Sequence, residues 1–146
     1  MLLQRIALAR GPDAAADVLD TPCYWNLYSV HYYAGRLTEA RIAYQKRITD
    51  DTADVKAHAA LGAIAARLAD TTAVEVQRRW LAAHDNPVAL LGLARIAVLQ
   101  GHQGEAVAFL REALDRNLER HFLHLDPDLE PLRDYPPFRE LMRFRG

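Results

Sequence analysis

The chain has 146 residues, of which 51% are hydrophobic and 25% charged, and this composition indicates a globular domain, not a disordered chain. Eighteen basic and nineteen acidic residues give a net charge of -1, which argues against nucleic acid as a partner. The single cysteine, Cys23, excludes an internal disulfide and fits a small packed side chain better than a nucleophile.

The first residues do not have the pattern of an export signal. Gln4 and Arg5 interrupt the apolar residues that open the chain, whereas a signal peptide places its charge before an unbroken apolar stretch. The sequence also lacks any run of about 18 apolar residues, the length that a membrane-spanning helix needs. We therefore expect a cytoplasmic protein with no membrane partner.

Apolar residues recur at spacings of three and four along most of the chain, which is the period of a helix. Trp25, Tyr28, Ser29 and Tyr32, for example, share one helical face. Glycine, proline, aspartate and asparagine divide the chain at short intervals. The pattern predicts helices over 2–10, 13–19, 23–34, 37–49, 54–68, 71–84, 87–100, 103–117 and 136–143.

Small residues repeat along these helices at an almost fixed separation. In the second helix of each pair they are separated by 33 and 33 residues, at Ala40, Ala73 and Ala106. In the first helix of each pair they are separated by 33 and 32 residues, at Ser29, Gly62 and Ala94. Two antiparallel helices approach closely where small residues face each other, so the period indicates stacked helix–turn–helix units.

Three segments carry this pattern in register. They are Trp25-x-x-Tyr28-Ser29-x-x-Tyr32 with Gly35, Ala40 and Tyr44; His58-x-x-Leu61-Gly62-x-x-Ala65 with Ala73 and Trp80; and Leu90-x-x-Leu93-Ala94-x-x-Ala97 with Gly101, Ala106, Leu110 and Ala113. The pattern resembles the tetratricopeptide repeat over about residues 22–118. The resemblance implies an all-α fold in which helix–turn–helix repeats stack into a right-handed superhelix, an α-α solenoid.

The match to the family pattern is not complete. Tyr32 and Gly35 are one residue closer than usual, and Arg47 stands where a small residue is typical. In the second repeat, Leu68-Ala69-Asp70 replaces the usual glycine turn. These departures affect the expected pitch of the superhelix and leave the expected architecture unchanged.

We expect one domain over residues 1–146, in which residues 1–20 form a divergent helix pair, 22–118 three repeats and 119–146 a linker with a C-terminal capping helix. Pro136 and Pro137 suit the first turn of that last helix. Phe138, Leu141 and Met142 would then close the open end of the repeats. The tail resembles the segment that ends tetratricopeptide regions of bacterial signalling proteins, including kinases and transcriptional regulators.

No set of residues in the sequence indicates catalysis. His121-x-x-His124 near Asp126 and Asp128 could begin a metal site, but a linker with polar residues fits this segment better. The calcium-loop pattern Asp126-x-Asp128-x-Glu130 fails because Pro131 takes the place of the required glycine. Ser29, His31 and His58 fall at packing positions of their helices. We therefore expect no enzyme activity, no metal and no cofactor.

In tetratricopeptide proteins the first helix of each repeat lines the concave face. The resemblance carries this role to the residues next to the packing positions, namely Asn26, Val30, Tyr33, Lys56, Ala59, Ala63, Arg67, Val88, Leu91, Arg95 and Val98. The expected partner-binding residues are Asn26, Tyr33, Lys56, Ala59, Ala63, Arg67, Leu91 and Arg95. Three cations among small apolar residues fit an extended or helical peptide with a carboxylate. The alternative is that Lys56, Arg67 and Arg95 are solvated charges.

The predicted function is a protein–protein interaction scaffold that binds a partner protein or peptide in the concave groove. The set that clamps chaperone C-termini is absent, because the corresponding places hold Asn26, Val30, Ala60, Val88 and Gly92. The alternative is a structural or self-associating module of a larger bacterial regulator, which would form a homo-oligomer through its apolar ends. A metal protein built around His121 and His124 is the third hypothesis.

Overall fold

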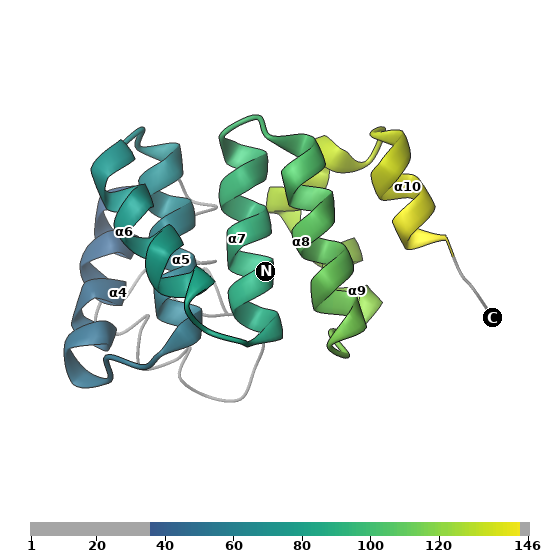
Figure 1. Ribbon diagram of the computed structural model, residues 1–146. Coiled ribbons are helices and arrows are strands. Elements are labelled where there is room, and N and C mark those ends of the chain that lie inside the picture. Colours follow the sequence, from purple (N-terminus) through teal and green to yellow (C-terminus); the bar gives the residue numbers. More distant parts are fainter. Residues whose placement is uncertain (1–35, 144–146) are drawn as a thin grey trace, which may run out of the picture.

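The computed structural model of the protein describes residues 36–143 and is all-α over that range, without a strand (Figure 1). In chain order the helices are α4 (Leu37–Asp50), α5 (Val55–Arg67), α6 (Thr71–Ala82), α7 (Pro87–Leu99), α8 (Gln103–Asp115), α9 (Arg120–Leu125), the 3-10 helix η1 (Pro127–Leu132) and α10 (Pro136–Met142). Helix predictions from residue 37 onward are confirmed, with ends that differ by at most two residues. The helices predicted over 2–10, 13–19 and 23–34 lie outside the described residues.

The segment between the last predicted repeat and the capping helix differs from its prediction. Residues 119–135 were expected to form a linker, but they contain α9 and η1. Pro127 opens η1 at a position where its missing N–H is not needed, and Pro131 lies inside it. A six-residue α-helix and a six-residue 3-10 helix are too short for their periodicity to stand out in the sequence.

The helix starts follow from capping residues in the sequence. The Asp54 carboxylate accepts a hydrogen bond from the Ala57 N–H at 3.0 Å, and the Asp70 carboxylate accepts one from the Ala73 N–H at 3.2 Å. At the start of α7 the Asn86 side chain accepts from the Val88 N–H at 2.8 Å, and Pro87 occupies the first helical turn. Each cap satisfies a backbone donor that has no partner inside its helix.

The turns that follow α5 and α7 have the same backbone form. Gly101 follows α7 with φ of 81°, and Ala69 follows α5 with φ of 56°. Both values lie in the left-handed region, which glycine adopts readily and alanine does not. Ala69 therefore takes the role of the glycine that the repeat pattern expects, and its backbone is strained there.

Close helix contacts occur where the sequence places small residues. A Cβ added to Gly92 of α7 would lie 2.6 Å from the Ala59 Cβ of α5. A Cβ added to Gly62 of α5 would lie 2.5 Å from the Cδ1 of Ile96 on α7. Helix α5 contacts both α6 and α7, and α7 also contacts α8, so consecutive helix pairs pack through α5 and α7 (Figure 1).

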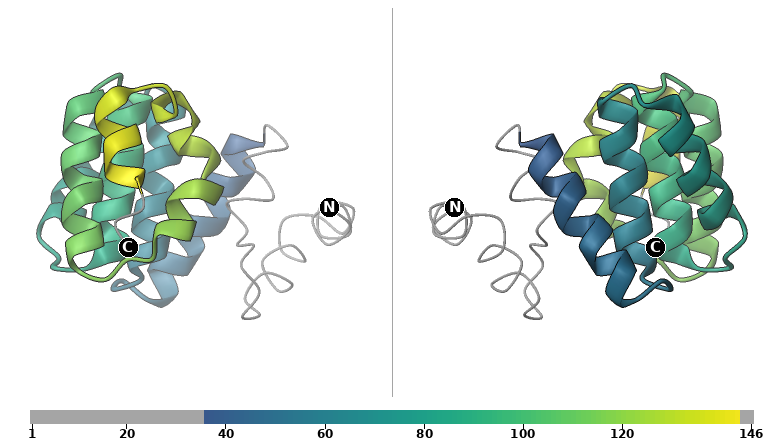
Figure 2. Two further views of the ribbon diagram at one scale, coloured as in Figure 1. Left: turned by 90° about the vertical axis from the view of Figure 1, so that its right-hand side faces the viewer. Right: turned by 90° about the vertical axis from the view of Figure 1, so that its left-hand side faces the viewer.

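A third layer covers α7 on the side away from α8. The end-on views show α9 and η1 along this side, and α7 contacts both α8 and η1 (Figure 2). The buried cluster between them contains Leu91, Ala94 and Val98 of α7 together with Leu123, Leu129, Leu132 and Phe138. Helix α7 is therefore buried on nearly all sides, which explains why its sequence is apolar apart from Arg95.

The apolar side chains of the last helix, α10, pack onto the helices before it. Phe138 is buried in the cluster that α7, α8, α9 and η1 share, and Leu141 and Met142 pack against it half-buried. Helix α10 also contacts α8. The apolar side chains at this end of the described residues are thus covered by the end of the chain itself.

Arg47, which departs from the repeat pattern, has a structural role. Its guanidinium donates to the carboxylate of Asp54 at 2.9 Å and lies over the Tyr44 ring, with its central carbon 5.6 Å from the ring centroid. Asp54 is also the N-cap of α5, so this contact connects α4 to the start of the next helix.

Among the described residues, no helix is both long and apolar enough to cross a membrane.

Candidate functional site: the inner face of α5 and α7

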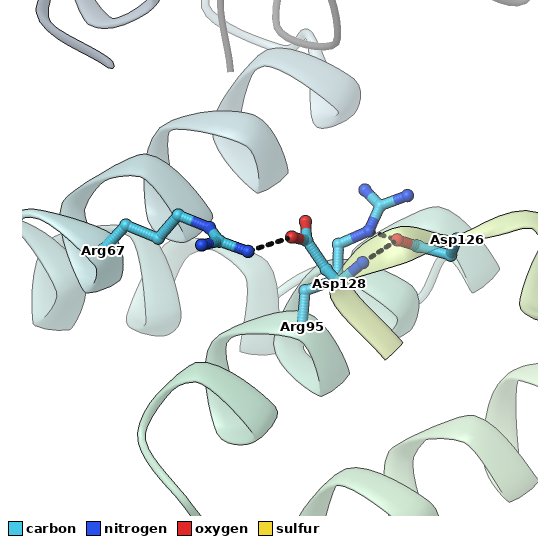
Figure 3. A network of polar contacts seen from close by, with 4 residues as sticks. All are labelled: Arg67, Arg95, Asp126 and Asp128. Atoms are coloured by element: carbon cyan, nitrogen blue, oxygen red, sulfur yellow. Dashed lines mark hydrogen bonds and ion pairs between the residues drawn. The ribbon is translucent and has the colours of Figure 1, made fainter. Parts of the chain in front are cut away.

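The candidate site is the surface of α5 and α7 against which residues 126–132 lie, here named the inner face. Arg95, from the middle of α7, donates through Nε to the Asp126 carboxylate at 2.5 Å (Figure 3). The Arg95 side chain is 23% exposed and that of Asp126 only 4%. A charge-assisted hydrogen bond of this kind is stronger than a neutral one, and partial burial reduces its screening by salt.

A second ion pair lies beside the first, at the end of α5. The Arg67 guanidinium donates to the Asp128 carboxylate at 3.0 Å, and the Asp128 side chain is 1% exposed (Figure 3). A buried carboxylate without a cation would be costly, so Arg67 compensates the burial of Asp128. The pair joins residues 61 positions apart in the sequence.

The two aspartates are held in one turn. One Asp126 oxygen accepts the backbone N–H of Asp128 at 3.0 Å and caps η1, while the other accepts from Arg95 (Figure 3). Pro127, between them, fixes its own backbone and restricts the residue before it. The inner face therefore binds a short, stiff acidic segment through two guanidinium groups, and buried Leu129 adds apolar contact.

Three residues predicted to line an open groove are instead in the core. Ala59 is 1% exposed, Ala63 is fully buried, and Leu91 is 6% exposed. Ala59 packs against Gly92 at the contact between α5 and α7, whereas Leu91 belongs to the cluster under η1. The prediction that these side chains face an open groove was wrong, because neighbouring helix pairs and the tail cover them.

The remaining predicted residues have different positions. Lys56 is exposed at the start of α5, and Arg67 and Arg95 hold the acidic segment. Val88 is half-buried, and Val98 is buried in the cluster shared with η1. Asn26, Val30 and Tyr33 lie outside the described residues. Arg67 and Arg95 pair with the chain's own Asp128 and Asp126, and their role in binding a partner stays a prediction.

Sequence reasoning identified the two arginines but missed their partners. Asp126 and Asp128 were considered only as possible metal ligands beside His121 and His124, and as the start of a calcium loop, which was rejected. One feature of the sequence did point to a covering layer, since α7 has apolar residues on every side and a helix of that kind is normally buried. The opposite charges of the two segments fit the contact, but they do not single out this segment among the acidic residues of the chain.

A stack of three rings forms a second polar cluster, next to the start of α5. The His58 ring lies 3.6 Å from Trp80, centroid to centroid, and Trp80 lies 3.7 Å from His84. The ring nitrogens of His58 contact Gln77 Oε1 at 2.7 Å and the Thr52 carbonyl at 2.9 Å. Since His58 is 7% exposed with both nitrogens engaged, the prediction of a packed histidine is confirmed.

The pair His121 and His124 does not lie in a metal-binding cluster. Both residues are in α9, both are exposed, and His121 Nδ1 lies 3.0 Å from the Glu119 carboxylate. Within residues 36–143, the structure groups no three histidine, cysteine or acidic side chains that could hold a metal ion. The nearby Asp126 and Asp128 point to arginines of α7 and α5 instead.

No protein-family model, curated protein or solved structure matches this chain. Its function is therefore inferred from its own residues.

Proposed function

We propose that the chain is a protein-interaction scaffold of tetratricopeptide-like helix pairs, with its inner face closed by its own acidic segment. The repeat part of the proposal is supported by matched positions in two consecutive pairs. Gly62 and Ala94 are buried at the packing positions, and Ala69 and Gly101 adopt the same left-handed turn. The superhelical arrangement of further repeats is part of the same proposal.

The observation that carries the binding role is the contact between the inner face and residues 126–132. Two arginines on neighbouring helices each hold a carboxylate, and the leucines of η1 enter an apolar cluster beside them. Peptide-binding surfaces combine apolar contact with fixed cations that pair with carboxylates. In this chain an internal segment occupies the inner face, so an external partner can bind in one of two ways. It displaces this segment, or it binds another surface.

The test is affinity capture from a cell lysate with three versions of the full chain. They are the wild type, the double variant Asp126→Asn/Asp128→Asn, and the control Glu130→Gln/Asp134→Asn. Both double variants remove two negative charges from the same region, but Glu130 and Asp134 are exposed. Circular dichroism on each version establishes that the helical fold is retained.

We expect wild type to capture a defined partner protein. More of that partner on Asp126→Asn/Asp128→Asn, with no gain on the control, would place it on the inner face in competition with the acidic segment. Equal capture by all three versions would place the partner on another surface. Capture of nothing, or only of further copies of the chain, would contradict the scaffold and favour the self-associating module.

A further inference from the structure

A pocket of about 660 Å³ lies between α9, η1 and α10, beyond the inner face. Its floor is apolar: Leu123, Leu129 and Phe138 are 2%, 1% and 6% exposed. Half-buried Met142 forms part of the wall. The floor residues belong to the same buried cluster as the apolar residues of α7, so the pocket is supported by the core. A volume of this size suits a few side chains of a bound segment.

The rim of this pocket is positively charged. Arg133, Arg139 and Arg143 line it together with His124, and Glu140 is the one acidic residue among the lining residues that the structure describes. The whole chain, in contrast, has a net charge of -1. The excess of cations is therefore local to this end of the molecule and favours an anionic partner.

The rim arginines are available to such a partner. Arg133 pairs with Glu130 at 2.7 Å and Arg143 with Glu140 at 3.4 Å, each three residues away on an exposed surface. Exposed pairs of this kind contribute little and exchange readily for a better carboxylate. Over the described part of the chain, the structure gives Arg139 no carboxylate partner, and its side chain is exposed.

We propose that this pocket docks a partner protein through a short segment in which an apolar side chain is flanked by carboxylates. The apolar side chain enters the floor beside Phe138 and Met142, and the carboxylates pair with Arg139 and its neighbours. The chain's own acidic segment has the same chemistry, since Leu129 lies between Asp128 and Glu130 and Asp128 pairs with an arginine. The proposal rests on the scaffold function and names the chemistry of its partner.

A protein segment fits this pocket better than a membrane surface or a nucleic acid. Both of those are extended anionic surfaces that need a broad positive field, whereas here the cations ring a recess with a buried apolar floor. An apolar anchor within a charged rim is the arrangement of a peptide-binding pocket.

The test selects binders to the full wild-type chain from a random peptide library displayed on phage. We expect enriched peptides to combine aspartate or glutamate with leucine, isoleucine, phenylalanine or methionine. A labelled enriched peptide is then titrated into wild type, Arg139→Glu and Met142→Ser, with fluorescence anisotropy as the readout. The matched control is Arg111→Glu, the same charge reversal at an exposed position of α8.

We expect Arg139→Glu to weaken binding by about tenfold or more, Met142→Ser to weaken it less, and Arg111→Glu to leave it unchanged. Affinity for wild type should fall as salt rises. Three results would each overturn the proposal that the pocket docks a partner. They are enriched peptides without carboxylates, equal binding to Arg139→Glu and wild type, and no enrichment. If Arg139→Glu captured the partner from lysate at the wild-type level, only the docking role of the pocket would be overturned. If wild type captured no partner, the proposed scaffold function itself would be overturned.

Discussion

Arg95 and Asp126 lie 31 residues apart in the sequence and form one hydrogen-bonded ion pair at 2.5 Å between α7 and the start of η1. This pair and its neighbour, Arg67 with Asp128, anchor the tail of the chain on the inner face. A surface that the repeat pattern would leave open to a partner is thereby covered. The two arginines retain the chemistry expected of a peptide-binding face while the chain itself supplies the carboxylates.

Removal of the Asp128 carboxylate should destabilise the fold. Asp128→Ala removes a buried side chain and its hydrogen bond, but the Arg67 left behind is 40% exposed and stays solvated, so a loss of about 1 to 3 kcal/mol is expected. The measurement is the free energy of unfolding from urea denaturation. Glu130→Ala is the control, because Glu130 and its partner Arg133 are both about 60% exposed and such a pair contributes about 0 to 1 kcal/mol. Similar losses in the two variants would show that Asp128 is not held as described.

Gly92→Ala should destabilise the contact between α5 and α7. The added methyl group would lie 2.6 Å from the Ala59 Cβ and 3.2 Å from its Cα, so the helices must separate, at a cost of about 1 to 3 kcal/mol. Gly62→Ala should cost less, because the nearest atom is the end of the Ile96 side chain and no backbone atom of another helix lies as close as the Ala59 Cα lies to Gly92. Gly104→Ala is the control: only the Tyr135 hydroxyl lies near, at 3.6 Å, so a gain of up to about 1 kcal/mol is expected. Thermal unfolding of the three variants would contradict this packing if Gly92→Ala were the most stable.

Glycine at position 69, in the turn after α5, should stabilise the fold. Ala69 has φ of 56°, and Ala69→Gly relieves a left-handed strain of about 1 kcal/mol. Gly101 adopts φ of 81° with no atom within 4 Å of an added Cβ, so Gly101→Ala should cost about the same for conformational reasons alone. Opposite shifts in melting temperature are expected. Shifts of the same sign would mean that the two turns are not equivalent.

The carboxyl group of Glu75 should titrate well below its ordinary range. Hydrogen bonds from Arg78 and then Arg79 lower its pKa to about 2. A lowered pKa means that Glu75 favours the folded state above its ordinary pKa, and that this contribution is lost as the pH falls from about 4.5 towards 2. Carboxyl-carbon NMR measures the pKa directly. Arg78→Ala should raise it more than Arg79→Ala, and an unchanged pKa in both variants would rule out this cause.

The all-α fold and the order of its helices could be predicted from the sequence because they depend on local patterns. Asp54, Asp70 and Asn86 mark helix starts, and Gly62 marks a close contact, each within a few residues of the feature it determines. The side of α5 on which Ala59 lies could not be predicted as reliably as the helix itself. An error of one residue turns a side chain by about 100° around a helix, which is enough to move it from an open face into an interface.

The closure of the inner face was not predicted for a different reason. It joins Asp126 and Asp128 to arginines 31 and 61 residues away, and no local period connects them. The short helices α9 and η1 give too few turns for a recognisable pattern. The sequence of α7, which is apolar except for Arg95, indicated that another segment covers the helix, but the pattern did not indicate which segment.

The most direct test of the closed inner face is a double-mutant cycle on Arg95 and Asp126. The free energy of unfolding is measured for wild type, Arg95→Met, Asp126→Asn and the combined variant. Methionine keeps part of the Arg95 stem, and asparagine can still accept the N–H of Asp128. A closed face predicts a coupling energy of about 1 to 3 kcal/mol between the two positions. Additive effects, with a coupling near zero, would show that the tail does not lie on α7 and would contradict the account.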